Sequence, residues 1–149
     1  MQNELARPAD QRYNSGTRIF ISYDNRDQDV AEVLAALLSE TGHEVWYSAA
    51  EILPGDNWAL EVGKALEECD AMVVVLSPSA LASNRIMDDV SLALGSSNYS
   101  DRLIPVQAKG IAGGHVPWIL KKMKLVRYVA SRPEEAIRQI IERLERAPV

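Results

Sequence analysis

The chain has few of the residues that build disulfide or metal-bound scaffolds. Its 149 residues include one cysteine, Cys69, and two histidines, His43 and His115. One cysteine cannot form an internal disulfide, and it fits a reducing compartment. Two isolated histidines cannot supply the ligand cluster of a zinc site. We therefore expect no disulfide and no metal site.

Long hydrophobic runs and targeting signals are also missing from the sequence. No apolar run approaches the 18 or so residues of a membrane-spanning helix, and no signal-peptide pattern is present. Residues 1–16 are polar and contain proline and glycine, which is typical of a flexible N-terminal tail. We expect a cytoplasmic protein with no membrane partner.

Positive charge is scarce in most of the chain. The net charge is −5, although residues 121–146 carry eight Lys or Arg against four Glu. An acidic body argues against nucleic-acid binding. The basic segment at residues 121–124 is most simply explained as a solvated loop or helix end.

Five short apolar runs alternate with helical patterns along the sequence. The runs cover residues 18–23, 43–48, 71–77, 103–107 and 125–129. Between two of them, Val30, Val33, Leu34, Leu37 and Leu38 follow helical spacing, and Gly42 supplies a stop. Such alternation predicts an α/β fold, a flavodoxin-like doubly wound five-stranded parallel sheet with strand order 2-1-3-4-5. We expect one domain at residues 17–146 and a short tail at 147–149.

One expected strand contains a proline, and three more expected helices have an apolar stripe. Pro105 makes the fourth strand uncertain, because proline cannot donate to a sheet ladder. Three more helical stripes are Trp58, Val62, Ala65 and Leu66; Ile86, Val90, Ala93 and Leu94; and Ile137, Ile140, Ile141 and Leu144. Pro133 is typical of the first turn of the last helix.

A sheet of this order places its ligand site beyond the carboxyl ends of the first and third strands. Those ends are residues 22–25 and 77–80, and the helix after the latter carries Asp88 and Asp89. At about 100° per residue, Asp88 lies roughly 175° from the centre of the apolar stripe, and Asp89 only about 85°. Asp88 is therefore predicted to be surface charge. Asp89 is the candidate functional carboxylate, the alternative being a first-turn acid that interacts with the helix dipole.

The acids after the first strand have a simpler interpretation. Asp24, Asp27 and Asp29 resemble part of the pocket of a phosphate-accepting receiver domain, but that domain needs an aspartate where this chain has Ser77. We expect Asp24 or Asn25 to cap the next helix, with Asp27 and Asp29 in its first turn. No nucleophile elbow and no phosphate-binding glycine fingerprint is present.

Three motifs together resemble a TIR (Toll/interleukin-1 receptor) domain of the bacterial type. They are "FISY" on the first expected strand, "PGDNW" in the loop after the second, and "VVVLSP" on the third. The resemblance covers residue 17 to about 146 and implies the fold predicted above. It also identifies residues 48–58 with the BB loop of the family, which implies self-association through a segment containing Leu53, Pro54, Gly55 and Asp56.

Many TIR domains cleave the bond between nicotinamide and ribose in NAD+, giving ADP-ribose or a cyclic isomer. The resemblance implies a catalytic motif S-x-W-x-x-x-E, which falls on Ser83, Arg85 and Asp89 in this chain. Aspartate keeps the charge of the family's glutamate but is one methylene shorter. Arg85 replaces an aromatic wall with a cation, which could pair with Asp89 at i, i+4.

The resemblance favours an NAD+ glycohydrolase or cyclase, in the class of NAD+ nucleosidases. It implies a bacterial effector of innate immunity against phage, activated by self-assembly and by a separate sensor protein or signalling ligand. Asp89 would be catalytic, NAD+ would be the substrate, and no cofactor or metal would be needed. The substrate-binding residues would be Tyr23, Asp24, Asn25, Trp58, Ser83 and Arg85.

Other functions remain open on the sequence alone. The main alternative is a non-catalytic TIR scaffold or adaptor that acts through TIR–TIR interaction. A nucleoside deoxyribosyltransferase or an unrelated flavodoxin-like binder is less favoured.

Overall fold

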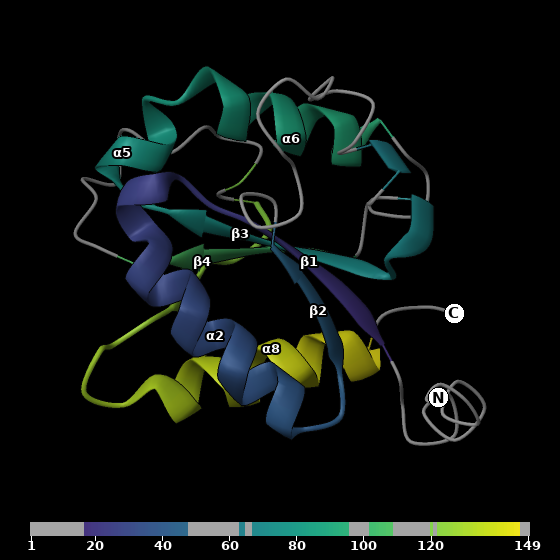
Figure 1. Cartoon of the computed structure of the whole chain (residues 1–149), viewed down its shortest axis with the longest axis vertical. Coiled ribbons are helices and arrows are strands. Elements are labelled where there is room, and N and C mark those ends of the chain that lie inside the picture. Colours follow the sequence, from purple (N-terminus) through teal and green to yellow (C-terminus); the bar gives the residue numbers. More distant parts are fainter. Residues whose placement is uncertain are drawn as a thin grey trace, which may run out of the picture.

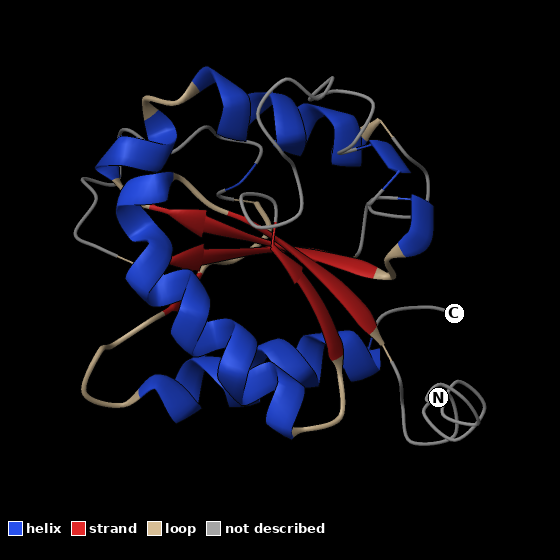
Figure 2. Cartoon of the chain, in the orientation of Figure 1, coloured by secondary structure: helices blue, strands red, loops and turns tan. Residues whose placement is uncertain are grey.

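The computed structural model describes residues 17–47, 63–64, 67–95, 102–108, 120 and 122–146. Five parallel strands form one sheet in the order β2-β1-β3-β4-β5 (Figure 2). They are β1 (Arg18–Ser22), β2 (Glu44–Tyr47), β3 (Ala71–Leu76), β4 (Leu103–Gln107) and β5 (Val126–Arg127). The predicted fold class and strand order are therefore confirmed, and every strand falls within its predicted run.

Helices cover both faces of this sheet (Figure 1). They are the 3-10 turn η2 (Asn25–Asp27), α2 (Gln28–Glu40), α5 (Pro78–Leu81), α6 (Asn84–Leu94) and α8 (Pro133–Arg146). Helices α2 and α8 pack on one face, whereas α5 and α6 pack on the other. None of the described helices is long and apolar enough to cross a membrane.

The strand β3 is the centre of the fold. All six of its residues have no exposed surface, because β1 and β4 pair with its two edges and helices cover its two faces. This explains why its sequence is apolar throughout instead of alternating.

Each face of the sheet has its own core. Ile19 and Ile21 of β1 pack with the α2 and α8 side chains, and Phe20 packs with those of α6. This alternation follows from the two-residue period of a strand. The same parity places Ser22, the last residue of β1, on the α6 face.

The amphipathic helices bury the stripes that their spacing predicts. Val30, Leu34 and Leu38 of α2 are buried, as are Ile137 and Ile140 of α8. Helix α2 ends in a Schellman arrangement, in which the backbone N–H of His43 donates to Leu38 and that of Gly42 to Ser39. Gly42 has φ 97°, a left-handed conformation that glycine adopts without strain. The predicted stripe of Trp58, Val62, Ala65 and Leu66 lies outside the described residues.

Pro105 lies in β4 at a position where it loses no ladder hydrogen bond. The backbone N–H of Ala108 donates to Leu76 of β3, so by alternation the N–H groups of β4 at even positions face β3. Position 105 therefore faces β5, which begins only opposite Val106. This resolves the difficulty that Pro105 poses at the sequence level.

Candidate functional site at the carboxyl end of the sheet

Asp89 is a fully buried carboxylate on the second turn of α6. Its exposed fraction is 0%, and its Oδ2 accepts a hydrogen bond of 2.7 Å from the Ser22 hydroxyl. Ser22, also 0% exposed, ends β1, so the bond joins residues 67 positions apart. The candidate carboxylate is thus held at the carboxyl end of β1, the place where the strand order predicts a ligand site.

Helical phase separates Asp89 from its neighbour as predicted. Asp88 is exposed, whereas Ile86, Val90 and Ala93 are buried with Asp89. Ser83 is the N-cap of α6, because its hydroxyl accepts a hydrogen bond from the backbone N–H of Ile86. Asp89 is more deeply buried than a position on the flank of the stripe implies, since the Ser22 hydroxyl supplies a polar partner beneath the helix.

A second buried serine–aspartate pair lies at the same end of the sheet. Ser77, which follows β3, donates a hydrogen bond to the Asp27 carboxylate, and both residues are 1% exposed. The Ser77 hydroxyl also accepts a bond of 3.1 Å from the backbone N–H of Ala80, which caps α5. Asp27 lies in the first turn of η2, as the sequence predicts, and its carboxylate is buried there as part of this pair.

Each of the two serine–aspartate pairs joins the end of one central strand to the segment that follows the other central strand. Ser22 at the end of β1 bonds to the helix that follows β3, and Ser77 at the end of β3 bonds to the turn that follows β1. A further contact links these loops, because the Arg26 guanidinium donates to the Ser79 hydroxyl at 3.5 Å. Together these bonds fix the segments around the topological switch point between β1 and β3.

The other predicted site residues near β1 are Tyr23, Asp24 and Asn25, and their side chains lie in different surroundings. Asp24 caps η2, since its carboxylate accepts a 3.0 Å bond from the backbone N–H of Arg26, and Asn25 is exposed. Tyr23 is buried in the core beneath α2 and α8. The structure thus brings Asp24 and Asn25 to the carboxyl end of β1 and packs the Tyr23 side chain on the sheet face opposite Asp89.

Several predicted site residues cannot be placed. Trp58 and the self-association segment Leu53, Pro54, Gly55 and Asp56 lie outside the described residues. Arg85 is in the first turn of α6, but its side chain is not among those described. Its predicted pairing with Asp89 therefore stays a prediction.

Sequence reasoning did not single out Ser22 as a site residue. The sequence nevertheless contained an indication, because a serine that ends a buried apolar run needs a polar partner inside the protein. The same reasoning applies to Ser77 after the apolar run of β3. What the sequence could not give was the partner, which depends on how α6 and η2 lie over the strand ends.

The chemistry available to the site follows from the Asp89 carboxylate and the Ser22 hydroxyl bonded to it. A carboxylate with a hydroxyl donor can stabilise a nearby positive charge and bind sugar hydroxyls. Among the described residues, no group of three or more His, Cys, Asp or Glu could hold a metal ion.

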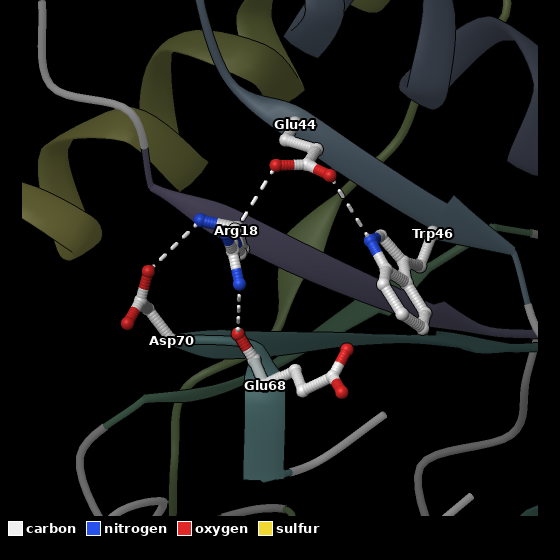
Figure 3. A network of polar contacts seen from close by, with 5 residues as sticks. All are labelled: Arg18, Glu44, Trp46, Glu68 and Asp70. Carbon is white, nitrogen blue, oxygen red and sulfur yellow. Dashed lines mark hydrogen bonds and ion pairs between the residues drawn. The ribbon is translucent and has the colours of Figure 1, made fainter. Parts of the chain in front are cut away.

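The amino end of the sheet has a separate polar network around Arg18 (Figure 3). The Arg18 guanidinium pairs with Glu44 at 3.3 Å and donates to the backbone oxygen of Glu68, while its backbone N–H donates to Asp70. Trp46 donates its indole N–H to Glu44 at 3.4 Å. These contacts tie the starts of β1, β2 and β3 together at the end of the sheet away from Asp89.

Burial also affects a thiol near this network. Burial of Cys69, together with the carboxylates of Asp70 and Glu44, raises the pKa of its thiol to about 12. Such a thiol is protonated at neutral pH and is therefore a poor nucleophile.

A hollow of about 540 Å³ lies between α2 and α8. Leu37, Ile137 and Ile141 contribute apolar surface to it, and most of its other lining residues are glutamates. It is on the sheet face opposite Asp89, so the candidate carboxylate takes no part in it.

Comparison with known proteins identifies the family of this fold. The family model of the TIR domain matches residues 19–141. The chain is also similar to the 2' cyclic ADP-D-ribose synthase BtTIR of Bacteroides thetaiotaomicron, with 33% identity over 66 residues. The matched segment covers 44% of this chain and 23% of that protein, so the chain spans only about a quarter of its relative's length.

Solved structures show the same architecture. The TIR domain of the Toll-related receptor TRR-2 from Hydra magnipapillata superposes with a TM-score of 0.70 at 20% identity, covering 87% of this chain and 98% of that one. A metazoan TIR-STING receptor from C. gigas superposes with a TM-score of 0.69 at 20% identity, covering 82% of this chain and 38% of the receptor. At such identities these likenesses concern the fold alone.

Proposed function

The chain belongs to the TIR domain family, and on this basis we propose that it cleaves the nicotinamide–ribose bond of NAD+ with Asp89 as its catalytic carboxylate. The observation that carries the proposal is the position of Asp89. The side chain is buried at the carboxyl end of β1, bonded to Ser22, beside the switch point where sheets of this order bind ligands. The relative named as a 2' cyclic ADP-D-ribose synthase supports NAD+ as the substrate.

The proposed reaction breaks one bond and forms one. The C1′–N bond of NAD+ breaks, its electron pair leaves with nicotinamide, and the ribose acquires oxocarbenium character. Water then adds to C1′ and releases a proton, giving ADP-ribose, or a hydroxyl of the same molecule adds and gives a cyclic isomer. Asp89 would stabilise the positive ribose and hold its hydroxyls. NAD+ is the substrate, and the proposal needs no metal or further cofactor.

Complete burial of Asp89 has a consequence for this activity. A substrate can contact the carboxylate only after the groups that cover it move aside. We therefore propose that the isolated domain is nearly inactive and that self-association, through the segment containing Leu53, Pro54, Gly55 and Asp56, opens the site. A separate sensor protein or signalling ligand would supply the trigger in the cytoplasm of a bacterium defending itself against phage.

The proposal assigns supporting roles to other residues. Asp24 and Asn25 lie at the carboxyl end of β1 and would line the substrate site, and Ser83 would fix the start of α6. Trp58 is proposed to stack on a ring of the substrate, and Arg85 to contact the substrate from the position where the family motif has tryptophan. The Tyr23 side chain is a weaker candidate, since it packs in the core beneath α2 and α8.

A non-catalytic scaffold is the second candidate function. The observation that favours it is the same burial, because a 0% exposed aspartate bonded to a buried serine can serve packing alone. Such a domain would assemble with copies of itself or with a partner TIR domain and would leave NAD+ intact.

The decisive experiment follows nicotinamide release from NAD+ by chromatography. The purified chain is assayed when dilute and when concentrated with a crowding agent, and linear and cyclic ADP-ribose are separated. We expect release only in the assembled state, and at least a hundredfold loss in Asp89→Asn, which keeps the shape and removes the charge. The matched control is Asp88→Asn, one residue away and exposed, which should retain the parent rate.

The outcomes separate the two candidates. No nicotinamide release by demonstrably assembled parent protein would establish the scaffold interpretation. Release that survives Asp89→Asn would remove Asp89 from the mechanism while keeping the activity. In Asp89→Glu the added methylene extends the carboxylate, and we expect a higher rate than the parent if the short side chain limits catalysis.

A further inference from the structure

We propose that Ser22 is a positioning residue for Asp89, a role that rests on the proposed NAD+ cleavage. Ser22 would not touch the substrate. Its hydroxyl donates to Oδ2 of Asp89 at 2.7 Å and thereby fixes the direction in which the carboxylate is presented.

Ser22 is the polar last residue of an otherwise apolar, buried stretch of β1. Ile19, Phe20 and Ile21 before it are all buried and apolar, and Ser22 itself is 0% exposed. A buried hydroxyl in such a position loses its hydrogen bonds to water and needs a partner inside the protein. The partner that the structure provides is the Asp89 carboxylate, so the hydroxyl of Ser22 meets this need by bonding the proposed catalytic group.

The bond between Ser22 and Asp89 restricts the orientation of the carboxylate. The 2.7 Å between the Ser22 hydroxyl oxygen and Oδ2 of Asp89 is the usual length of a well-formed O–H···O hydrogen bond. Ser22 is anchored in the central part of the sheet by pairing of β1 with both β2 and β3. Asp89 has one methylene, so its carboxylate has two rotatable bonds, and a donor on a rigid strand fixes both of them. The catalytic group is therefore positioned by the sheet as well as by its own helix.

Without this bond the Asp89 carboxylate would be held less precisely, and the chemical step would slow. Misplacement of a reacting group by about 1 Å can cost roughly a hundredfold in rate. Since Ser22 contacts Asp89 and not the substrate, its removal should lower kcat while leaving KM nearly unchanged. Loss of general stability would instead lower the active fraction of the protein.

The chain offers a matched control for this distinction. Ser77 is also a buried serine at the end of a central strand, and it also donates to a buried aspartate, Asp27. The Ser77→Ala variant removes the same kind of bond without touching Asp89. A purely structural role for Ser22 predicts that Ser22→Ala and Ser77→Ala behave alike per folded molecule.

The test measures kcat and KM for nicotinamide release by assembled parent, Ser22→Ala, Ser22→Thr and Ser77→Ala, with the folded fraction of each determined by circular dichroism. We expect Ser22→Ala to lose about ten- to a hundredfold in kcat with KM within about twofold. Ser22→Thr keeps a hydroxyl on a residue suited to a strand, and it should recover most of that loss. Ser77→Ala should keep kcat within about threefold per folded molecule.

Each outcome bears on the proposal in a different way. Ser22→Ala with the parent kcat, or with a loss no larger than that of Ser77→Ala, would overturn the positioning role and leave the NAD+ activity standing. If Ser22→Ala does not fold, the test depends on Ser22→Thr, which keeps the hydroxyl. A ten- to hundredfold loss of kcat in folded Ser22→Thr would show that the hydroxyl is not what supports the rate. An assembled parent that releases no nicotinamide would overturn both the activity and this inference.

Discussion

Ser77 donates a hydrogen bond to Asp27 across the two loops that follow β3 and β1. Both side chains are buried, and the same serine hydroxyl caps α5. One hydroxyl therefore supports a carboxylate and a helix start at once, and its removal should lower the stability of the protein.

Ser77→Ala is expected to lower the free energy of unfolding by about 2–4 kcal/mol. The loss combines a hydrogen bond to a buried charged group with an N-cap. Urea denaturation followed by circular dichroism measures it. Ser79→Ala is the control, because its bond from Arg26 is long and largely exposed, and it should change stability by less than about 0.5 kcal/mol. Equal stabilities of the two variants would contradict the importance of the buried pair.

Two adjacent isoleucines on α8 provide a test of the core. Ile140 is fully buried against the sheet, whereas Ile141 is only partly buried. Ile140→Ala should destabilise the protein by roughly 2–5 kcal/mol, because it removes buried methyl groups and leaves a cavity. Ile141→Ala should cost about half as much. Thermal and urea unfolding measure both, and a larger effect of Ile141→Ala would mean that α8 is rotated from the described packing.

Cys69 should resist thiol reagents in the native protein. Its pKa is raised to about 12 by burial and nearby carboxylates, so at pH 8 the reactive thiolate is about a thousandfold rarer than in an unfolded chain with the ordinary value of 9.0. Reaction with a chromogenic disulfide reagent, with and without denaturing urea, measures the difference. Comparable rates in the two conditions would show that the thiol is accessible.

His43 should make the protein less stable in mildly acidic solution. Burial lowers the pKa of His43 below 6.5, and this outweighs a hydrogen bond with the Thr17 backbone and the charge of Glu145, which both raise it. Between that lowered value and 6.5 the unfolded chain binds more protons than the folded protein. The contribution of His43 to the free energy of unfolding is thus fully present above about pH 6.5. It is lost as the pH falls towards the pKa of His43 in the folded protein.

The matching measurement compares urea unfolding of the parent and of His43→Gln at a series of pH values between 5 and 7.5. The variant should show a shallower dependence of the unfolding free energy on pH, since it has no group to protonate at this position. An identical dependence in both proteins would show that His43 does not contribute.

Much of the fold could be predicted because it depends on periodicity. The apolar runs and the helical spacing of residues such as Leu34 and Ile137 fixed the order of elements, and the right-handed crossover rule then left few topologies. Pro105 shows where such reasoning ends. The sequence marks it as a poor strand residue, and only the length of β5 reveals that its position has no ladder bond to lose.

The site could be predicted in part. Helical phase correctly separated the exposed Asp88 from the buried Asp89, because both lie on one regular helix. It could not identify Ser22 as the partner, since that contact joins residues 67 positions apart through the packing of α6 on β1. The first-turn position of Asp27 was predicted, but its burial against Ser77 was not, because that contact also depends on packing between distant segments. The role of Tyr23 in the site stays a prediction, and its side chain packs in the core beneath α2 and α8.

The two outer strands of the sheet are its shortest. β2 has four residues and β5 has two, with the exposed charged residues Glu44 and Arg127 among them. So short a border offers few unpaired amide and carbonyl groups to an incoming chain. For the self-association proposed above, such a border does not favour growth by lengthening the sheet from copy to copy, as in cross-β fibrils. We therefore expect copies of this domain to meet through helical and loop surfaces.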